Sequence, residues 1–358
     1  GLPNVGKSTL FNCLSNAKAQ SANFPFCTIE PNIGVVNVPD NRLTKLEELV
    51  NPERVMPATV DIVDIAGLVK GASKGEGLGN QFLGNIRETD AIIHVLRCFD
   101  NDNIVHVDGN INPIRDKETI DIELQLKDLE SLDKKLEKVR KTARTGNKDA
   151  QKEQEVLEKL KKGLEAAVSV RAIELSEKER EEYVTPLQFI TDKPVLYVCN
   201  VDEKSAVNGN DYVAKVKEAV KDENAEVIVL AVGTEADITE LDSFEERQLF
   251  LEDLGLQEAG SSVLIRAAYK LLNLQTYFTA GVKEVRAWTI NIGDTAPQAA
   301  GVIHSDFEKG FIRAEVIAYD DYVKFGSEAK VKEAGKMKVE GKEYIVKDGD
   351  VMHFRFNV

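Results

Sequence analysis

The chain has 358 residues, of which 42% are hydrophobic and 30% are charged, and this is enough for two or three domains with real cores. The net charge of −15 argues against a protein that coats nucleic acid over its whole surface, although a local basic patch stays open. The four scattered cysteines argue against a disulfide framework or a zinc site, and no apolar run is long enough to span a membrane.

The chain begins with a phosphate-binding loop. Residues 1–8 read G-L-P-N-V-G-K-S, a complete G-x-x-x-x-G-K-S motif, and an apolar helix start follows. In such loops backbone N–H groups surround phosphate oxygens, while Lys7 reaches the β- and γ-phosphates and the Ser8 hydroxyl binds Mg²⁺. The motif predicts a bound nucleoside triphosphate, held by Asn4, Val5, Gly6, Lys7, Ser8 and Thr9. Because these loops follow a buried strand and none precedes Gly1, we expect the numbering to start after a short first strand.

Short β-branched runs alternate with helical stretches as far as Leu230. The expected buried strands are 34–38, 59–63, 91–96, 195–199 and 227–230. Helices between such strands imply a mostly parallel sheet covered on both faces, because parallel strands need crossover connections. The sequence therefore predicts an α/β fold.

A helical hairpin interrupts this alternation at 112–187. Apolar residues recur every three or four positions over 129–143 and again over 157–164, with Thr145-Gly146-Asn147 between them. This spacing predicts an antiparallel pair of helices. The tip is basic, with Glu137 as the main opposing charge, and its cations are Lys134, Lys135, Lys138, Arg140, Lys141, Arg144 and Lys148. Either these cations form a solvated helix surface, or they contact RNA phosphates and gain by releasing counterions.

The character of the chain changes again after about Leu274. Strand-like runs occur at 285–290, 311–317, 344–346 and 351–356, and one short helix fits 296–306. These runs predict a compact α+β module of ubiquitin-like size without a catalytic constellation. The expected division of the chain is 1–111 and 188–274 for the two parts of the α/β domain, 112–187 for the insertion and 275–358 for the last module.

A second motif supports the phosphate-binding loop. Residues 61–67 end a predicted strand with D-x-A-G, in which Asp64 can hold Mg²⁺ through a coordinated water and the Gly67 N–H can meet the γ-phosphate. Mg²⁺ prefers octahedral oxygen coordination, so a further hydroxyl is expected, and Thr28 follows the first helix at a suitable distance. The predicted metal ligands are Ser8, Thr28 and Asp64, an arrangement typical of GTPase switches.

The residue after Gly67 is Leu68, where small GTPases place the glutamine that orients the attacking water. A leucine cannot orient water, so either hydrolysis is slow or another group takes this role. His106 is a candidate for this role and would have to swing in, but an ordinary loop histidine fits the sequence equally. Lys7 and Gly67 are the other expected catalytic groups. The glycine-rich run 71–79 is expected to become ordered when triphosphate is bound.

The base-reading position departs from the GTPase pattern. GTPases read guanine with Asn-Lys-x-Asp, whereas this chain has Asn200-Val201-Asp202-Glu203. The lysine is absent and glutamate is one methylene longer than aspartate, which disturbs a bidentate contact with guanine. Asn200 can still pair with the N6/N7 edge of adenine, and Val201 offers backbone groups. The preference for guanine is therefore weakened, while adenine is not proved.

These motifs resemble the YchF family of Obg-like ATPases. The resemblance covers essentially the whole chain and rests on 1–9, 23–32, 64–69 and 348–358. It implies a P-loop NTPase fold of the GTPase type, with a coiled-coil insertion and a C-terminal TGS domain at about 275–358.

The resemblance also assigns roles to single residues. It implies that ATP is preferred over GTP through contacts with Asn200 and Val201, and that Mg²⁺ is held by Ser8 and Thr28. A catalytic histidine of the family matches His106, and an asparagine that helps to bind K⁺ in related enzymes matches Asn4.

The resemblance finally implies a cytoplasmic ATPase that acts as a nucleotide switch on the ribosome, in translation or stress regulation. We expect a monomer that contacts the large ribosomal subunit, and rRNA through the basic tip and the TGS domain, with no membrane partner. Two alternatives stay open. One is an Obg-type GTPase in which Glu203 reads guanine, and the other is a ribosome- or RNA-binding adaptor in which the nucleotide serves only structure.

Overall fold

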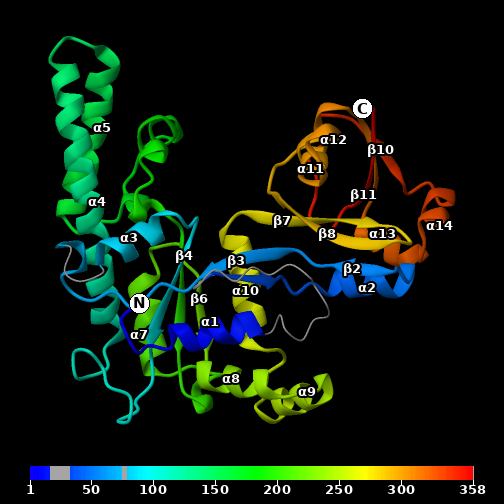
Figure 1. The fold of residues 1–358 in the computed structure, drawn as a ribbon, viewed down its shortest axis with the longest axis horizontal. Coiled ribbons are helices and arrows are strands. Elements are labelled where there is room, and N and C mark those ends of the chain that lie inside the picture. Colours follow the sequence, from blue (N-terminus) through cyan, green and yellow to red (C-terminus); the bar gives the residue numbers. More distant parts are fainter. Residues whose placement is uncertain (17–32, 75–78, 358) are drawn as a thin grey trace. The chain divides into compact units, whose positions relative to one another are not determined.

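The computed structural model describes residues 1–16, 33–74 and 79–357 (Figure 1). Contacts between Cα atoms group the chain into two compact units. Unit 1 comprises 1–34 and 63–264, and unit 2 comprises 35–62 and 265–358. This grouping cuts the chain at other places than the predicted four-part division, which stays a prediction.

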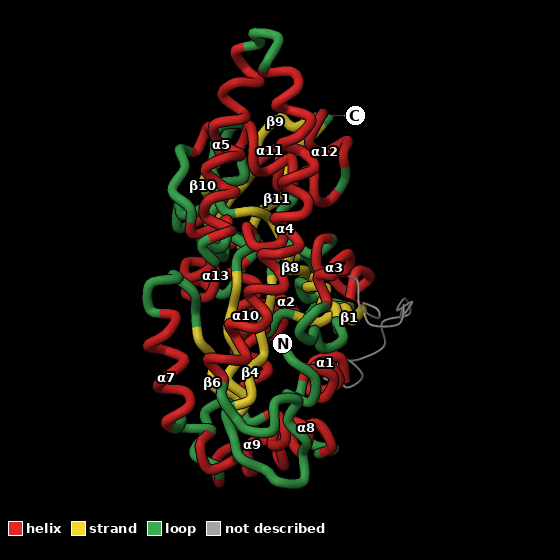
Figure 2. The backbone as a smooth tube through the Cα atoms, turned by 90° about the vertical axis from the view of Figure 1, so that its left-hand side faces the viewer, coloured by secondary structure: helices red, strands yellow, loops and turns green. Residues whose placement is uncertain are grey.

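Unit 1 is built on a three-stranded parallel sheet. Its strands follow the order β4 (Ile92–Arg97), β5 (Val195–Asn200) and β6 (Val227–Leu230). All six residues of β5 are buried, as expected for a central parallel strand covered on both faces. Helix α7 (Asp211–Val220) lies on one side of these strands and α1 (Lys7–Asn16) on the other (Figure 2). Three of the predicted strands are therefore confirmed.

The core beside this sheet joins β4, β5 and α7. Leu96, Cys98, Tyr197 and Cys199 are buried there against Val216. Cys13 is buried as well, in α1, so three of the four thiols are core residues. The fourth cysteine, at position 27, lies outside the described residues.

The inserted hairpin consists of α4 (Pro113–Ala143) and α5 (Lys148–Glu165), which run side by side (Figure 1). Helix α4 starts where Asn112 accepts a hydrogen bond from the Arg115 N–H and Pro113 occupies the first helical turn. The seam is formed by fully buried leucines, namely Leu132, Leu136, Leu157 and Leu160. Each buried leucine contributes about 2 kcal/mol through the hydrophobic effect, so packing holds the two helices together. The predicted antiparallel hairpin is confirmed.

The rest of unit 1 is helical. After α5 the chain returns to β5 through short helical turns, which the sequence analysis did not anticipate. The remaining α-helices of this unit are α3 (Gly79–Arg87), α6 (Glu177–Glu179), α8 (Val232–Glu240) and α9 (Phe244–Asp253), and α10 (Gly260–Leu271) leads into unit 2.

The segment between the two parts of unit 1 carries strands β1 (Ile33–Asn37), β2 (Arg54–Met56) and β3 (Thr59–Val63) and helix α2 (Asn41–Val50). The predicted strands at 34–38 and 59–63 are thus present. They pair with each other in a two-stranded sheet that is separate from β4–β5–β6 among the described strands. Strand β2 instead pairs in parallel with β8 (Glu284–Asn291), and this pairing helps to place 35–62 in unit 2.

Unit 2 is organised by a six-stranded mixed sheet with the order β10–β9–β11–β7–β8–β2. Strand β11 pairs in parallel with β7 and antiparallel with β9. Alanines of α11 pack with Tyr277 and Phe354 in the core of this sheet. The elements not yet given are β7 (Leu274–Ala280), α11 (Ala296–Ile303), α12 (Ser305–Lys309), β9 (Phe311–Ile317), α13 (Tyr319–Phe325), α14 (Glu328–Glu333), β10 (Lys338–Glu340) and β11 (Val351–Phe356).

Two predictions for the C-terminal module are wrong in detail. Residues 344–346 do not form a strand, because the Tyr344 carbonyl accepts from the N–H of Ala296, the first residue of α11, and the Val346 N–H donates to the Asp294 carbonyl in the preceding loop. The single helix expected at 296–306 is two helices, α11 and α12. They are separated at His304, which is extended (φ −162°, ψ 141°) and caps α12.

Candidate nucleotide site

The phosphate-binding loop has the backbone that its glycines and asparagine predict. Asn4 (φ 60°) and Gly6 (φ 100°) lie in the left-handed region, and α1 starts at Lys7 with a bond from the Leu10 N–H to the Gly6 carbonyl of 2.9 Å. A Cβ on Gly6 would come within 2.5 Å of the Asn200 side-chain nitrogen. Ser8 and Thr9 are exposed on the first turn of α1, which leaves them accessible to a ligand.

The Lys7 side chain reaches back across the phosphate-binding loop. Its ammonium group donates to the Leu2 carbonyl at 2.6 Å. Burial lowers the pKa of Lys7 to about 8, while the nearby Asp64 carboxylate opposes this shift. A phosphate group placed beside the ammonium would raise the pKa of Lys7 again and favour the charged form.

Two of the three predicted metal ligands lie together. The Ser8 hydroxyl donates to an Asp64 carboxylate oxygen at 2.8 Å. A hydroxyl and a carboxylate are the hard oxygen donors that Mg²⁺ prefers, so the donor set fits this ion. The third predicted ligand, at position 28, lies outside the described residues.

The D-x-A-G motif lies directly against the phosphate-binding loop. A Cβ on Gly67 would come within 2.5 Å of the Pro3 backbone nitrogen, so only glycine permits this approach. The Leu68 N–H donates to the Gly1 carbonyl at 3.2 Å, and the Leu68 side chain is 3% exposed. The leucine is thus a packing residue, which agrees with its inability to orient water.

Asn200 ties the end of β5 to the phosphate-binding loop. Its side-chain N–H donates to the Val5 carbonyl at 2.9 Å, and its oxygen accepts from the Val232 N–H at 3.1 Å. The Val201 N–H donates to the Leu230 carbonyl at 3.0 Å, so the Val201 carbonyl is the backbone group available to a base. Glu203 is exposed beyond this position.

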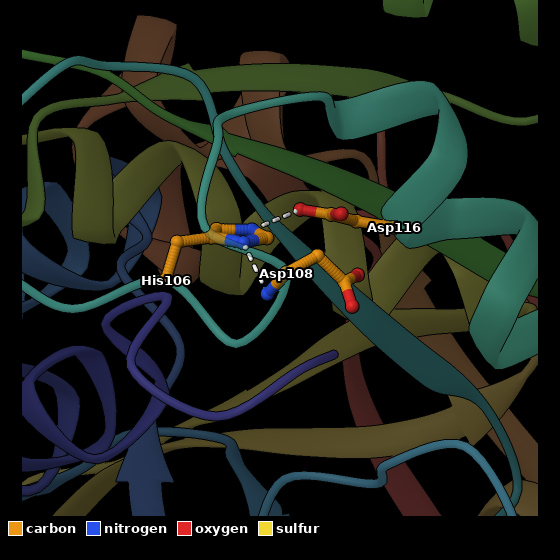
Figure 3. A group of neighbouring side chains, drawn as sticks. All are labelled: His106, Asp108 and Asp116. Carbon is orange, nitrogen blue, oxygen red and sulfur yellow. Dashed lines mark hydrogen bonds and ion pairs between the residues drawn. The ribbon is translucent and has the colours of Figure 1, made fainter.

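His106 is buried, and both of its ring nitrogens are engaged (Figure 3). Nδ1 accepts from the Asp108 backbone N–H at 3.1 Å, and therefore Nε2 carries the proton and donates to Asp116 at 2.7 Å. Asn4 donates to the neighbouring Val105 carbonyl at 3.3 Å, which brings the His106 segment next to the phosphate-binding loop.

His106, Asp108 and Asp116 also form a group whose potential metal-ligand atoms all lie within 4.8 Å of one another. Arg115 already supplies positive charge to this group, at 3.4 Å from Asp108 and 3.2 Å from Asp116. The cluster is therefore a hydrogen-bonded ionic network, and an added cation would have to displace the guanidinium and the Nε2 proton.

Sequence reasoning missed two buried charged residues near the site. Glu123, on α4, accepts hydrogen bonds from the backbone N–H groups of Gly71 and Ser73. Arg97 ends β4 and donates to three carbonyls of the loop that follows. Neither residue lies within the apolar runs on which the predicted strands and helical hairpin rest, so the sequence pattern gave no signal for them.

The basic tip of the hairpin is more neutralised than the sequence suggested. Four of its seven cations form ion pairs, not only with Glu137 but also with Glu130, Glu153 and Glu158. The other three cations, which form no ion pair with described residues, are Lys138, Arg144 and Lys148. Among the described residues, every helix is too short or too polar to span a bilayer.

Comparisons with known proteins agree with this geometry. A family model described as a 50S ribosome-binding GTPase matches residues 1–130. A second one, for the C-terminal domain of YchF-type GTPases and described as a protein of unknown function, matches residues 274–357.

The chain also aligns with relatives over almost their whole length. The chain is 59% identical to the Ribosome-binding ATPase YchF of Haemophilus ducreyi and 56% identical to that of Bacillus subtilis, covering 100% of this chain and 98% of each relative. The solved structure of the Schizosaccharomyces pombe YchF GTPase superimposes with a TM-score of 0.90 at 39% identity, covering 99% of this chain and 96% of that one. The fold is thus a P-loop NTPase fold of the GTPase type, and the chain belongs to the YchF family.

Proposed function

We propose that the chain is a Mg²⁺-dependent ATPase that prefers ATP over GTP and works as a nucleotide switch on the ribosome in the cytoplasm. One observation carries the proposal: Asp64, Gly67 and Asn200, from separate parts of the sequence, all contact the phosphate-binding loop. The names of the relatives, ribosome-binding ATPases, support the same function.

The base preference follows from what surrounds Asn200. The guanine-reading lysine and aspartate are replaced by Val201 and Glu203. One N–H and one lone pair of the Asn200 amide are used within the protein, which leaves its second N–H and second lone pair for the adenine N7/N6 edge. The Val201 carbonyl can accept a further bond from the adenine amino group.

Ser8 and Asp64 would hold Mg²⁺, with Thr28 as a further ligand. When bound, the ion neutralises charge that develops on the phosphate oxygens. Lys7 turns from the Leu2 carbonyl to the β- and γ-phosphates, and the Gly67 N–H donates to the γ-phosphate. Asn4 keeps its side-chain oxygen for a K⁺ ion, because its nitrogen donates to Val105.

Hydrolysis is expected to be slow, since Leu68 is buried and cannot position water. His106 can take this role only after releasing the Asp116 or the Asp108 bond, so its participation requires a movement of its loop. The switch would consist of ordering of Thr28 and of 64–79 by the triphosphate and their release after hydrolysis.

The decisive test is titration calorimetry with ATP and GTP in the presence of Mg²⁺. ATP is expected to bind at least tenfold more tightly than GTP, because the aspartate that accepts from guanine N1–H and N2–H₂ is replaced by the longer Glu203. The reverse order would establish the Obg-type GTPase instead.

Lys7→Ala is expected to weaken ATP binding at least tenfold and to abolish hydrolysis while the fold survives. Lys217→Ala, an exposed lysine on α7, is the matched control and keeps both activities. If the amount of protein that co-sediments with ribosomes changes neither with the nucleotide nor in Lys7→Ala, the adaptor function is favoured.

A further inference from the structure

Helix α4 carries three deeply buried carboxylates. Asp116, Glu123 and Asp128 are 1%, 4% and 0% exposed. Buried carboxylates are costly unless they are hydrogen-bonded, and each of these accepts bonds from outside the helical hairpin. Asp116 bonds to His106, Glu123 to the loop after the D-x-A-G motif, and Asp128 to the backbone just before β5.

Glu123 makes the contact that matters most for the nucleotide site. Its two oxygens accept from the Gly71 N–H at 2.7 Å and from the Ser73 N–H at 2.8 Å. Both distances are short, as expected for charge-assisted hydrogen bonds. The positive φ of Gly71 (92°) lets the backbone turn both N–H groups toward one carboxylate.

The loop held by Glu123 is fixed at its other end by the phosphate-binding loop. Leu68 donates to the Gly1 carbonyl, and Gly67 lies against Pro3. Only three residues separate Gly67 from Gly71. These three residues are too few to absorb a displacement of Gly67, so the displacement is transmitted to Glu123.

We propose that Glu123 is a positioning residue that holds 71–73 so that the Gly67 N–H faces the γ-phosphate, and that it couples the nucleotide state to the helical hairpin. The inference rests on the proposed ATPase function. Helix α4 has 31 residues, and its end at Ala143 lies about 30 Å from Glu123 at 1.5 Å per residue. A small tilt imposed at Glu123 is thereby enlarged at the tip.

Asp128 offers a matched control on the same helix. It also uses both oxygens, accepting from the Ile190 N–H at 2.9 Å and the Thr191 N–H at 2.7 Å, and neither bond reaches the described part of the nucleotide loops. Glu123→Gln and Asp128→Asn make the same chemical change, since each places an amide donor against a backbone N–H. The two variants should therefore lose similar amounts of stability, whereas only Glu123→Gln should lose the response to the nucleotide.

The test measures thermal unfolding, ATP affinity, kcat and amide hydrogen exchange over 130–160 with ATP or ADP. Glu123→Gln is expected to keep ATP affinity within threefold of the wild type, to lower kcat at least tenfold and to lose the ATP–ADP difference in exchange. Asp128→Asn is expected to keep kcat within twofold and to retain that difference. Ser73→Pro removes one donor from the loop side and should reproduce the loss of kcat if Glu123→Gln fails to fold.

Equal loss of kcat in Glu123→Gln and Asp128→Asn would overturn the positioning role, because Glu123 would then act only through stability. Identical exchange of the wild-type hairpin with ATP and ADP would overturn the coupling. If the wild type hydrolyses neither ATP nor GTP, the proposed function itself fails and this inference falls with it.

Discussion

At the residue scale, the loops of the candidate site are held by polar side chains that bond to backbone groups. Arg97, 2% exposed, donates to the carbonyls of Phe99, Asn101 and Ile104, and its guanidinium lies 4.8 Å from the Phe99 ring centre. Asn200 does the same for the phosphate-binding loop. Because buried backbone groups must be paired, these side chains replace the hydrogen bonds that loops lack.

The role of His106 can be tested at this scale. His106→Ala is expected to leave ATP affinity within twofold of the wild type and to lower kcat at least about tenfold, because general acid–base groups typically contribute about 10²–10⁴-fold. Single-turnover hydrolysis, with affinity measured separately by calorimetry, checks this expectation.

Asp116→Asn is the companion variant for His106. It keeps the imidazole but replaces the carboxylate that accepts the hydrogen bond from Nε2–H with a neutral amide. Normal turnover in His106→Ala would assign the histidine to structure alone, as a link between its loop and α4.

At the element scale, the helical hairpin has two faces with different chemistry. Its seam is made of leucines, as the spacing predicted, and its outer face is a mixture of paired and unpaired charges. An ion pair between exposed side chains contributes little to stability, but it does reduce the charge offered to a partner. Lys138, Arg144 and Lys148, which have no paired carboxylate among the described residues, are therefore the cations to test.

A triple variant with alanine at Lys138, Arg144 and Lys148 is expected to weaken ribosome binding and to lower the slope of log affinity against log salt by about 2, because fewer counterions are released. Co-sedimentation over a series of salt concentrations measures both quantities.

The matched control replaces three ion-paired lysines, Lys134, Lys135 and Lys141, and changes the net charge equally. A loss of the same size in both triple variants would show that only total charge matters, and that the tip makes no direct phosphate contact.

At the scale of the whole molecule, the C-terminal sheet needs a segment that lies far away in the sequence. Strand β2 pairs with β8, and Arg42 binds both oxygens of Asp348 at 2.8 and 3.2 Å while it also bonds to Asp40. Asp348 accepts in turn from the Thr276 N–H, so one ionic network joins the remote segment to strand β7. Unit 2 is thus assembled from two separate parts of the chain.

Arg42→Ala is expected to destabilise unit 2 by about 1–2 kcal/mol, since it removes charge-assisted bonds from a partly buried site and leaves Asp40 without its cation. Trp288, the only tryptophan, lies in β8 and reports unfolding of this unit by fluorescence.

Arg54→Ala serves as the control for Arg42. Its side chain is 70% exposed and pairs with Glu284 in the same unit, so the cost should be about 0.5 kcal/mol or less. Equal fluorescence midpoints for the two variants would mean that the Arg42 network does not stabilise unit 2.

The sequence by itself determined the ligand class, the strands of the α/β part and the hairpin. These features are local, because glycine spacing sets the backbone of the phosphate-binding loop and apolar periodicity sets the elements. In the C-terminal module the expected strand at 344–346 was wrong, since its backbone bonds to Asp294 and to Ala296 at the start of α11 and not to a strand.

Tertiary structure alone decided which distant groups meet. The bonds of Glu123 with Gly71 and Ser73, of Asn200 with Val5 and of Arg42 with Asp348 join residues 50 to 306 positions apart. Such contacts depend on how elements pack, and a single buried carboxylate or amide leaves no periodic signal in the chain. The sequence therefore shows what can be bound, and the packing fixes which side chains hold the site in place.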